Sequence, residues 1–196
     1  TWMSEHTEAK IRNMGLSGGE SILIVTTHSD DLRICPACDE LLTEFFVELR
    51  TFIDIGDYRL LYKSLGLTYT FREGHIEISC RDKIVGLRHM VFENMPELEK
   101  PTTRPLPPNF VLENPDEIMP SNEHDRARLE RFNNAMSFRS VLMTILWIAR
   151  MVRWDVQWVI ICLSATQSKP TLQAYIGLVH LTNYLLTTQE MTRVIS

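Results

Sequence analysis

Hydrophobic positions are most concentrated between residues 135 and 165, in the run AMSFRSVLMTILWIARMVRWDVQWVIICLSA. Four charged residues interrupt this run: Arg139, Arg150, Arg153 and Asp155. A charge in the middle of a bilayer costs about 3 kcal/mol, and a span needs roughly 20 apolar residues. We therefore expect no transmembrane segment. We expect instead a buried helix, or two helices that meet near Trp154.

Aromatic residues recur at helical spacing within this run. Trp147, Met151, Trp154 and Trp158 follow one another at steps of four, three and four residues, which puts them on one face of a continuous helix. A face of this kind is more typical of a core helix than of a cofactor or lipid site. The spacing thus predicts a C-terminal helical bundle built around Trp147, Trp154 and Trp158.

The first half of the chain alternates between strand and helix patterns. A β-branched run predicts a buried strand over residues 21–27, followed by a polar connection over 28–33. Apolar residues at helical spacing predict an amphipathic helix over 39–52. Alternation around the Arg72–Gly74 turn predicts a β-hairpin of residues 67–71 and 75–80.

The amino-acid composition changes after residue 95, where prolines become frequent. Seven of the nine prolines lie between residues 96 and 122, and proline blocks helix interiors and removes backbone donors. We expect a linker, or an extended chain draped over a surface and pinned by Phe110. The predicted fold is mainly α (α+β). Its parts are a mixed N-terminal lobe (1–95) that contains the β-hairpin, a proline-rich linker (96–122) and a C-terminal helical lobe (123–196).

Beyond the linker, helical spacing predicts one helix that begins near Asn122 and continues through Met136 into the central run. It carries a run of arginines. The candidate interaction residues are Arg126, Arg128, Arg131 and Arg139.

Charge is unevenly distributed along the chain. The net charge is −5, with about −8 over residues 1–120 and about +3 over residues 121–196 on the usual counting of ionised side chains. In many proteins, such a difference in charge between two halves only reflects charged side chains on solvent-exposed surfaces. It also allows an acidic front to attract a basic back between copies, or the arginine run to contact an anionic surface of nucleic acid or lipid headgroups.

Cys35 and Cys38 form the only arrangement with a chemical interpretation. The order of strand 21–27, the CPAC motif and an amphipathic helix resembles the opening of the thioredoxin/glutaredoxin family, and Pro108 before Asn109 resembles the proline of that family that precedes a strand. The resemblance implies a thiol oxidoreductase, with Cys35 as the nucleophile and Cys38 as the resolving thiol. A helix N-terminus lowers the pKa of a cysteine, which suits that chemistry.

Two other interpretations of these cysteines stay open. The first is a structural zinc site in which Cys35 and Cys38 are joined by Cys80 and either His75 or His89, giving the four ligands of tetrahedral zinc. The second is that both thiols are reduced and only pack in the core. We expect no cofactor, with zinc as the alternative.

Catalytic signatures are absent from the sequence. It contains no G-x-x-x-x-G-K-[ST], G-x-G-x-x-G or G-x-S-x-G motif. We therefore expect a non-enzymatic assembly or interaction protein with protein partners and self-association. Two small lobes on a linker resemble viral matrix or shell proteins, so such a structural role is included. The alternatives are the thioredoxin-like oxidoreductase and a zinc-stabilised adaptor. Four scattered cysteines and a polar N-terminus favour a reducing intracellular compartment, cytoplasm or nucleus.

Overall fold

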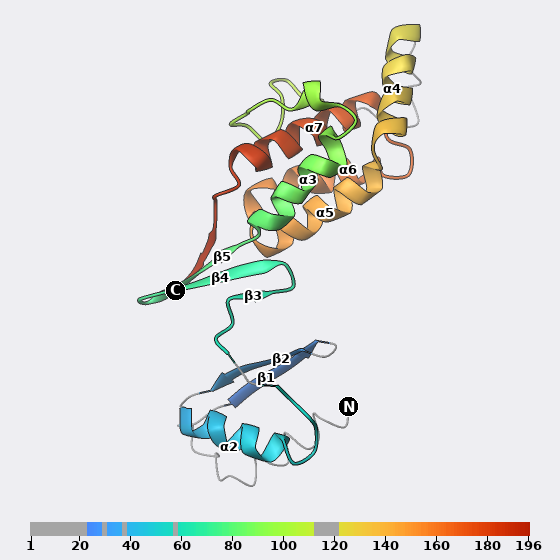
Figure 1. Ribbon diagram of the computed structural model, residues 1–196. Helices are drawn as coiled ribbons and strands as arrows, with labels where there is room; N and C mark the ends of the chain where they lie inside the picture. The colour runs from blue at the N-terminus through green and yellow to red at the C-terminus, as the bar shows by residue number, and fades with distance from the viewer. Residues whose placement is uncertain (1–22, 29–30, 37–38, 57–58, 112–121) are drawn as a thin grey trace. The chain divides into compact units, whose positions relative to one another are not determined.

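The structure, a computed structural model, divides the chain into two units of residues 1–61 and 62–196 (Figure 1). It describes residues 23–28, 31–36, 39–56, 59–111 and 122–196. The fold is mainly helical with a small antiparallel sheet, which confirms the predicted α+β class.

The first unit contains an antiparallel hairpin followed by a helix. Strand β1 (Leu23–His28) pairs with β2 (Asp31–Pro36) along their whole length, and helix α2 (Asp39–Leu49) follows directly. The predicted strand and amphipathic helix are therefore present. The polar connection expected over 28–33 is wrong, because Asp31, Leu32 and Arg33 belong to β2. Pairing with β1 satisfies their backbone groups whatever their side chains are.

The second unit begins with a sheet whose strand order is β3-β4-β5-β6. Its hairpin is β4 (Leu67–Arg72) with β5 (His75–Ser79), as predicted. A two-residue strand β3 (Lys63–Ser64) lies at one edge, and the C-terminal strand β6 (Arg193–Ile195) pairs with β5 at the other. The β5–β6 pairing joins segments more than 110 residues apart in sequence, which no local pattern predicts.

Helices make up the rest of the second unit, and α3, α5 and α7 pack against one another (Figure 1). The helical elements are α3 (Arg81–Phe92), η1 (Pro96–Leu98), α4 (Glu123–Ala135), α5 (Phe138–Met151), η2 (Trp154–Val156), α6 (Gln157–Ser164) and α7 (Leu172–Thr187). The apolar run thus forms two helices that meet at η2, one of the two arrangements expected. No helix in the described ranges is long and apolar enough to cross a membrane.

Side-chain caps mark where three helices of this unit, α4, α5 and α7, begin. Asn122 accepts a hydrogen bond from the backbone N–H of Asp125 (2.7 Å), so α4 begins where the sequence predicted. The predicted continuation of that helix into the central run is wrong. α4 ends at Ala135, and the Ser137 hydroxyl caps a new helix by accepting from the backbone N–H of Ser140.

Aliphatic side chains, not tryptophans, form the centre of the bundle. Trp154 and Trp158 are 56% and 70% exposed. The predicted core around the tryptophans is therefore wrong for Trp154 and Trp158, because the helix breaks after Met151 and its spacing does not continue to Trp158. Trp147 is half-buried and packs against the core. The completely buried residues include Ile84, Leu87, Val141, Leu142, Ile145, Ile148, Val156, Ile160, Leu163, Leu178, Leu181 and Leu185.

The described part of the proline-rich segment is attached to α7. Asn183 donates from Nδ2 to the carbonyl of Leu98 (2.9 Å) and accepts at Oδ1 from the backbone N–H of Lys100 (3.0 Å). Phe110 packs so close to Gly177 that a Cβ there would lie 2.7 Å from its ring. The segment is thus a draped chain held at Phe110, as expected.

Contacts divide the chain at Leu61, earlier than the predicted boundaries at residues 95 and 123. The reason is that α3 packs on α5 and α7, and the draped segment bridges to α7, so residues 62–111 share the core of the C-terminal helices.

Candidate interaction surface

The predicted arginine run is divided between two helices. Arg126, Arg128 and Arg131 lie exposed on α4, whereas Arg139 lies on α5 beyond the break at Ser137. Arg128 is 3.5 Å from the carboxylate of Asp125, and Arg131 forms an ion pair with Glu97. The structure therefore separates Arg139 from the others and partly neutralises two of them.

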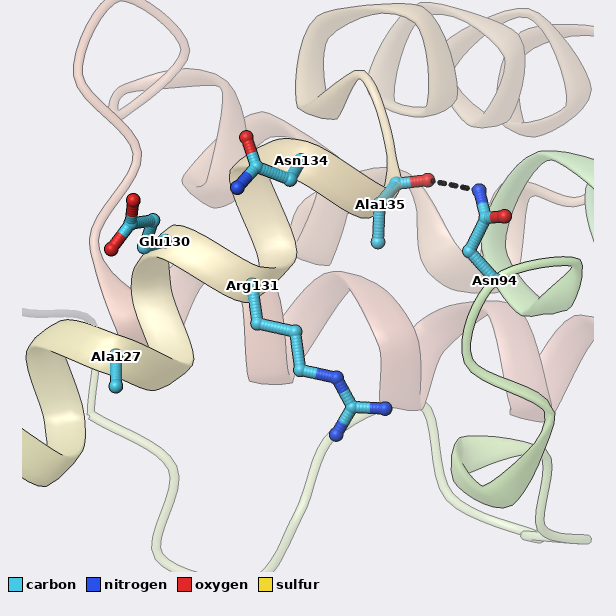
Figure 2. A pocket seen from close by; sticks show the side chains of 6 residues that line it. All are labelled: Asn94, Ala127, Glu130, Arg131, Asn134 and Ala135. Atoms are coloured by element: carbon cyan, nitrogen blue, oxygen red, sulfur yellow. Dashed lines mark hydrogen bonds between the residues drawn. The ribbon is translucent and has the colours of Figure 1, made fainter.

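A shallow groove of about 540 Å³ runs along α4. Figure 2 shows Arg131, Glu130 and Asn134 on the helix and the Asn94 amide, which donates to the carbonyl of Ala135 (3.0 Å). Among the described residues, Glu130 is the only carboxylate that lines the groove, and no histidine, cysteine or hydroxyl side chain of that part of the chain joins it. The lining offers hydrogen bonds and one cation, so it suits binding and supplies no nucleophile.

The predicted zinc ligands that the structure describes are not brought together. His75 begins β5 and Cys80 follows its end. At about 3.3 Å per residue, these positions are roughly 16 Å apart, too far for one metal. Burial raises the pKa of the Cys80 thiol to about 11, which disfavours the thiolate that binds metals. No group of three or more metal-binding side chains occurs in the described ranges.

Cys38 and the side chain of Cys35 lie outside the described residues. The backbone of Cys35 pairs with Ile24 in β2, and α2 begins at Asp39. The CPAC motif therefore falls at a strand-to-helix junction. Redox activity, zinc binding and simple packing all stay predictions.

One charged cluster lies inside the second unit, where α5 turns into α6. Arg153 is 1% exposed. It binds both carboxylate oxygens of Asp155 (2.9 and 2.8 Å), and it donates to the carbonyl (3.1 Å) and the hydroxyl (2.8 Å) of Thr188 at the end of α7. The Tyr184 hydroxyl donates to Asp155 (2.9 Å). The guanidinium lies 5.2 Å from the Tyr184 ring.

Protonation in this cluster follows from its hydrogen bonds. Burial by itself would raise the pKa of Asp155, but hydrogen bonds from Arg153 and Tyr184 outweigh it and hold that pKa below its ordinary value. Burial, followed by the bond to Asp155, raises the pKa of Tyr184. Arg153 and Asp155 thus form an ion pair whose hydrogen-bond partners, Thr188 and Tyr184, belong to the fold.

An exposed apolar surface lies beside this cluster. We define the tryptophan surface as Met151, Trp154, Trp158 and Ile161, which are 37%, 56%, 70% and 56% exposed. Trp158 and Ile161 are three residues apart on α6 and share a face. The indole N–H of Trp154 donates to the carbonyl of Arg150 (3.1 Å). Its polar atom is therefore satisfied, and what remains open is apolar ring.

The helices that carry the tryptophan surface are free of acidic side chains. Neither α5 nor α6 contains Asp or Glu, and Asp155 between them is paired with Arg153. Arg139, Met143 and Arg150 are exposed on α5 at spacings of four and seven residues, which place them on one face. In a chain of net charge −5, this exposed face of α5 carries positive and apolar side chains.

Comparisons with protein-family models, with curated proteins and with solved structures find no match to this chain.

The sequence patterns did not predict the buried pair of Arg153 and Asp155 or the tryptophan surface. The signal for Arg153 and Asp155 was two opposite charges inside an apolar run, since charges buried in a core are paired. The signal for the tryptophan surface was weak, because α6 (QWVIICLS) is apolar on nearly every side.

Proposed function

We propose that this protein is a non-enzymatic interaction protein that binds protein partners, further copies of itself included, through the tryptophan surface. The observation that supports it most is the exposure of Trp158 and Ile161 side by side on α6. Isolated apolar residues are common on protein surfaces, whereas contiguous patches mark interaction sites. Tryptophan is also enriched among the residues that dominate binding energy.

The energy that one tryptophan contributes is that of a strong single contact within a larger interface. A tryptophan buries roughly 150–250 Å², at about 25 cal/mol per Å² of apolar area removed from water. Since Trp158 is 70% exposed, covering its open part contributes roughly 3–4 kcal/mol to binding. Arg139 and Arg150 would favour a partner surface with acidic groups, because complementary charge directs specificity and association.

The described polar clusters argue for binding over catalysis. The groove along α4 lacks a nucleophile and a paired base. Arg153 and Asp155 are engaged with one another and with α7. A catalytic group must reach a substrate, and these two side chains are committed to the fold.

Sedimentation velocity of the purified chain tests this proposal. We expect the parent to associate as concentration rises, and Trp158→Ala and Ile161→Ser to weaken association by at least about tenfold, the equivalent of roughly 1.4 kcal/mol. Val47→Ser is the matched control, because Val47 is 65% exposed and lies on α2 in the other unit. A parent that stays monomeric at high concentration and low salt would refute self-association.

A dithiol oxidoreductase is the second candidate. It is supported by the position of the CPAC motif between β2 and α2. The assay is disulfide reduction by the parent and by Cys35→Ser. Activity lost in the variant with association intact supports the enzyme, and no activity in the parent removes it. A zinc-stabilised adaptor would carry stoichiometric zinc in a metal assay.

Two further predictions concern partners. A matrix- or shell-type role of the viral kind is one form of self-association, and it requires contacts that continue from copy to copy. Contact of Arg126, Arg128, Arg131 and Arg139 with nucleic acid or lipid headgroups would show as binding that weakens steeply with salt.

A further inference from the structure

The C-terminal strand β6 is short and lies at the edge of the sheet. It forms three residue pairs with β5, in which Ile76, Glu77 and Ile78 face Ile195, Val194 and Arg193. Val194 and Ile195 are 58% and 43% exposed, so their side chains are only partly covered by the core. Edge segments with few buried contacts are the ones that open locally in native proteins.

Arg193 carries most of the side-chain contacts that hold β6. Its guanidinium lies 4.1 Å from the centre of the Trp154 ring. One of its Nη atoms donates to the carbonyl of Met151 (3.3 Å). Met151 and Trp154 both belong to the tryptophan surface. The strand is therefore fastened to the same surface to which we assign partner binding.

The preceding helix is fastened much more firmly. Arg153 holds the carbonyl and the hydroxyl of Thr188, the residue that follows α7, and this guanidinium is buried whereas Arg193 is not. Between the two lies an exposed ion pair of Glu190 with Arg81 (2.9 Å), a kind of contact that contributes little to stability. Thr188 is thus the last residue of this segment that buried contacts hold to the helical core.

We propose that residues 189–196 form a strap that opens at Thr188 while α3, α5, α6 and α7 stay folded. Opening removes the guanidinium from Trp154 and frees the β5 edge. The apolar area of the tryptophan surface increases, and an unpaired strand edge is exposed beside it. The strap therefore regulates the interaction surface, a consequence that rests on the proposed function. Its opening is a property of the fold alone.

Hydrogen exchange of the backbone amides tests the opening directly. In the parent, we expect the amides of β6, and those β5 amides that donate toward β6 and not toward β4, to exchange much faster than those of α7, because they exchange through local opening. These β5 amides are the ones measured in the variants. Arg193→Ala removes the ring contact and the hydrogen bond, and should speed exchange in β5 and β6 about fivefold without changing α7. Arg193→Lys keeps a cation over the ring and should fall between the two.

Arg88→Ala is the matched control. Arg88 forms an exposed ion pair with Glu99 on the same unit, so its loss should leave β5 unchanged. Exchange of β5 and α7 at one common rate in the parent would overturn the strap, as would an unchanged β5 in Arg193→Ala. Sedimentation of the same variants tests the regulation separately. Stronger association in Arg193→Ala supports it. If exchange becomes faster but association does not become stronger, the strap opens without regulating the tryptophan surface, and the regulatory part of the proposal is refuted.

Discussion

The buried pair of Arg153 and Asp155 gives the sharpest test of how this fold is held together. We consider Asp155→Ala and Arg153→Met, alone and combined. The first removes the carboxylate and leaves a guanidinium that is 1% exposed without a counter-ion. The second removes the buried charge and leaves a carboxylate that is 33% exposed and reaches water. The two changes are therefore unequal, although each deletes one member of the same pair.

Removing one partner from a buried ion pair costs about 3–5 kcal/mol, because an uncompensated charge stays in the core. Since Asp155 is a third exposed, we expect Asp155→Ala near the lower end, about 3 kcal/mol. Arg153→Met loses hydrogen bonds to Thr188 but fills the space with an apolar chain, and should cost roughly 1–2 kcal/mol. The double variant should be no less stable than Asp155→Ala alone, since the orphaned charge has gone.

Urea unfolding and thermal melting measure these differences. For a chain of this size, 1 kcal/mol shifts Tm by roughly 2–4 °C, so Asp155→Ala should melt about 6–12 °C below the parent. Glu97→Ala is the control, because it breaks an exposed ion pair with Arg131 and should cost at most about 1 kcal/mol. If Arg153→Met is less stable than Asp155→Ala, the reasoning about the buried charge is wrong.

The same pair predicts a pH dependence. The pKa of Asp155 is held below its ordinary value in the folded protein, so the unfolded chain takes up its proton first as pH falls. The pair therefore stabilises the fold fully above the unfolded value, about pH 3.9, and this stabilisation is lost as pH falls through the lower folded value. Urea midpoints measured between pH 6 and pH 2 should fall less steeply for Asp155→Ala than for the parent.

Three further substitutions test individual contacts, two by the same unfolding assay and the third by limited proteolysis. Gly177→Ala places a Cβ 2.7 Å from the Phe110 ring and should destabilise by about 1–3 kcal/mol; a second change, Phe110→Leu, should recover part of that loss, and equal stability of parent and Gly177→Ala would contradict the close packing. Asn122→Ala removes the cap of α4 and should cost about 1 kcal/mol, whereas Asn122→Asp should retain most of it. Asn183→Leu removes both bonds to the draped segment and should make residues 96–111 the first site of limited proteolysis; an unchanged digestion pattern would show that these bonds do not hold the segment.

Local patterns determined much of the secondary structure. The β-hairpin of β4 and β5, the helix α2 and the cap at Asn122 depend on side-chain alternation, helical spacing and a capping side chain. All of these are properties of a few neighbouring residues, so they can be read without knowing the fold. The apolar run also excluded a membrane span on its own, because Arg153 and Asp155 interrupt it.

Tertiary structure decided which apolar residues are buried. Helical spacing grouped the tryptophans on one face, but the chain turns at η2, and Trp158 then belongs to a second helix with a different orientation. Likewise Arg139 was separated from Arg131 by a break of two residues at Met136 and Ser137. Helical spacing predicts which residues share a face only within one continuous helix. After a single break, the residues that follow can lie on a different face.

The sequence by itself determined that Arg153 and Asp155 are charges within an apolar stretch, and that the chain can build helices and a hairpin around them. Only the tertiary structure brought Thr188 and Tyr184 to that pair and Arg193 to Trp154. These contacts join residues about 30 to 40 positions apart. They form because packing α5, α6 and α7 into one core leaves the turn between α5 and α6 beside the end of α7, and no local pattern contains that information.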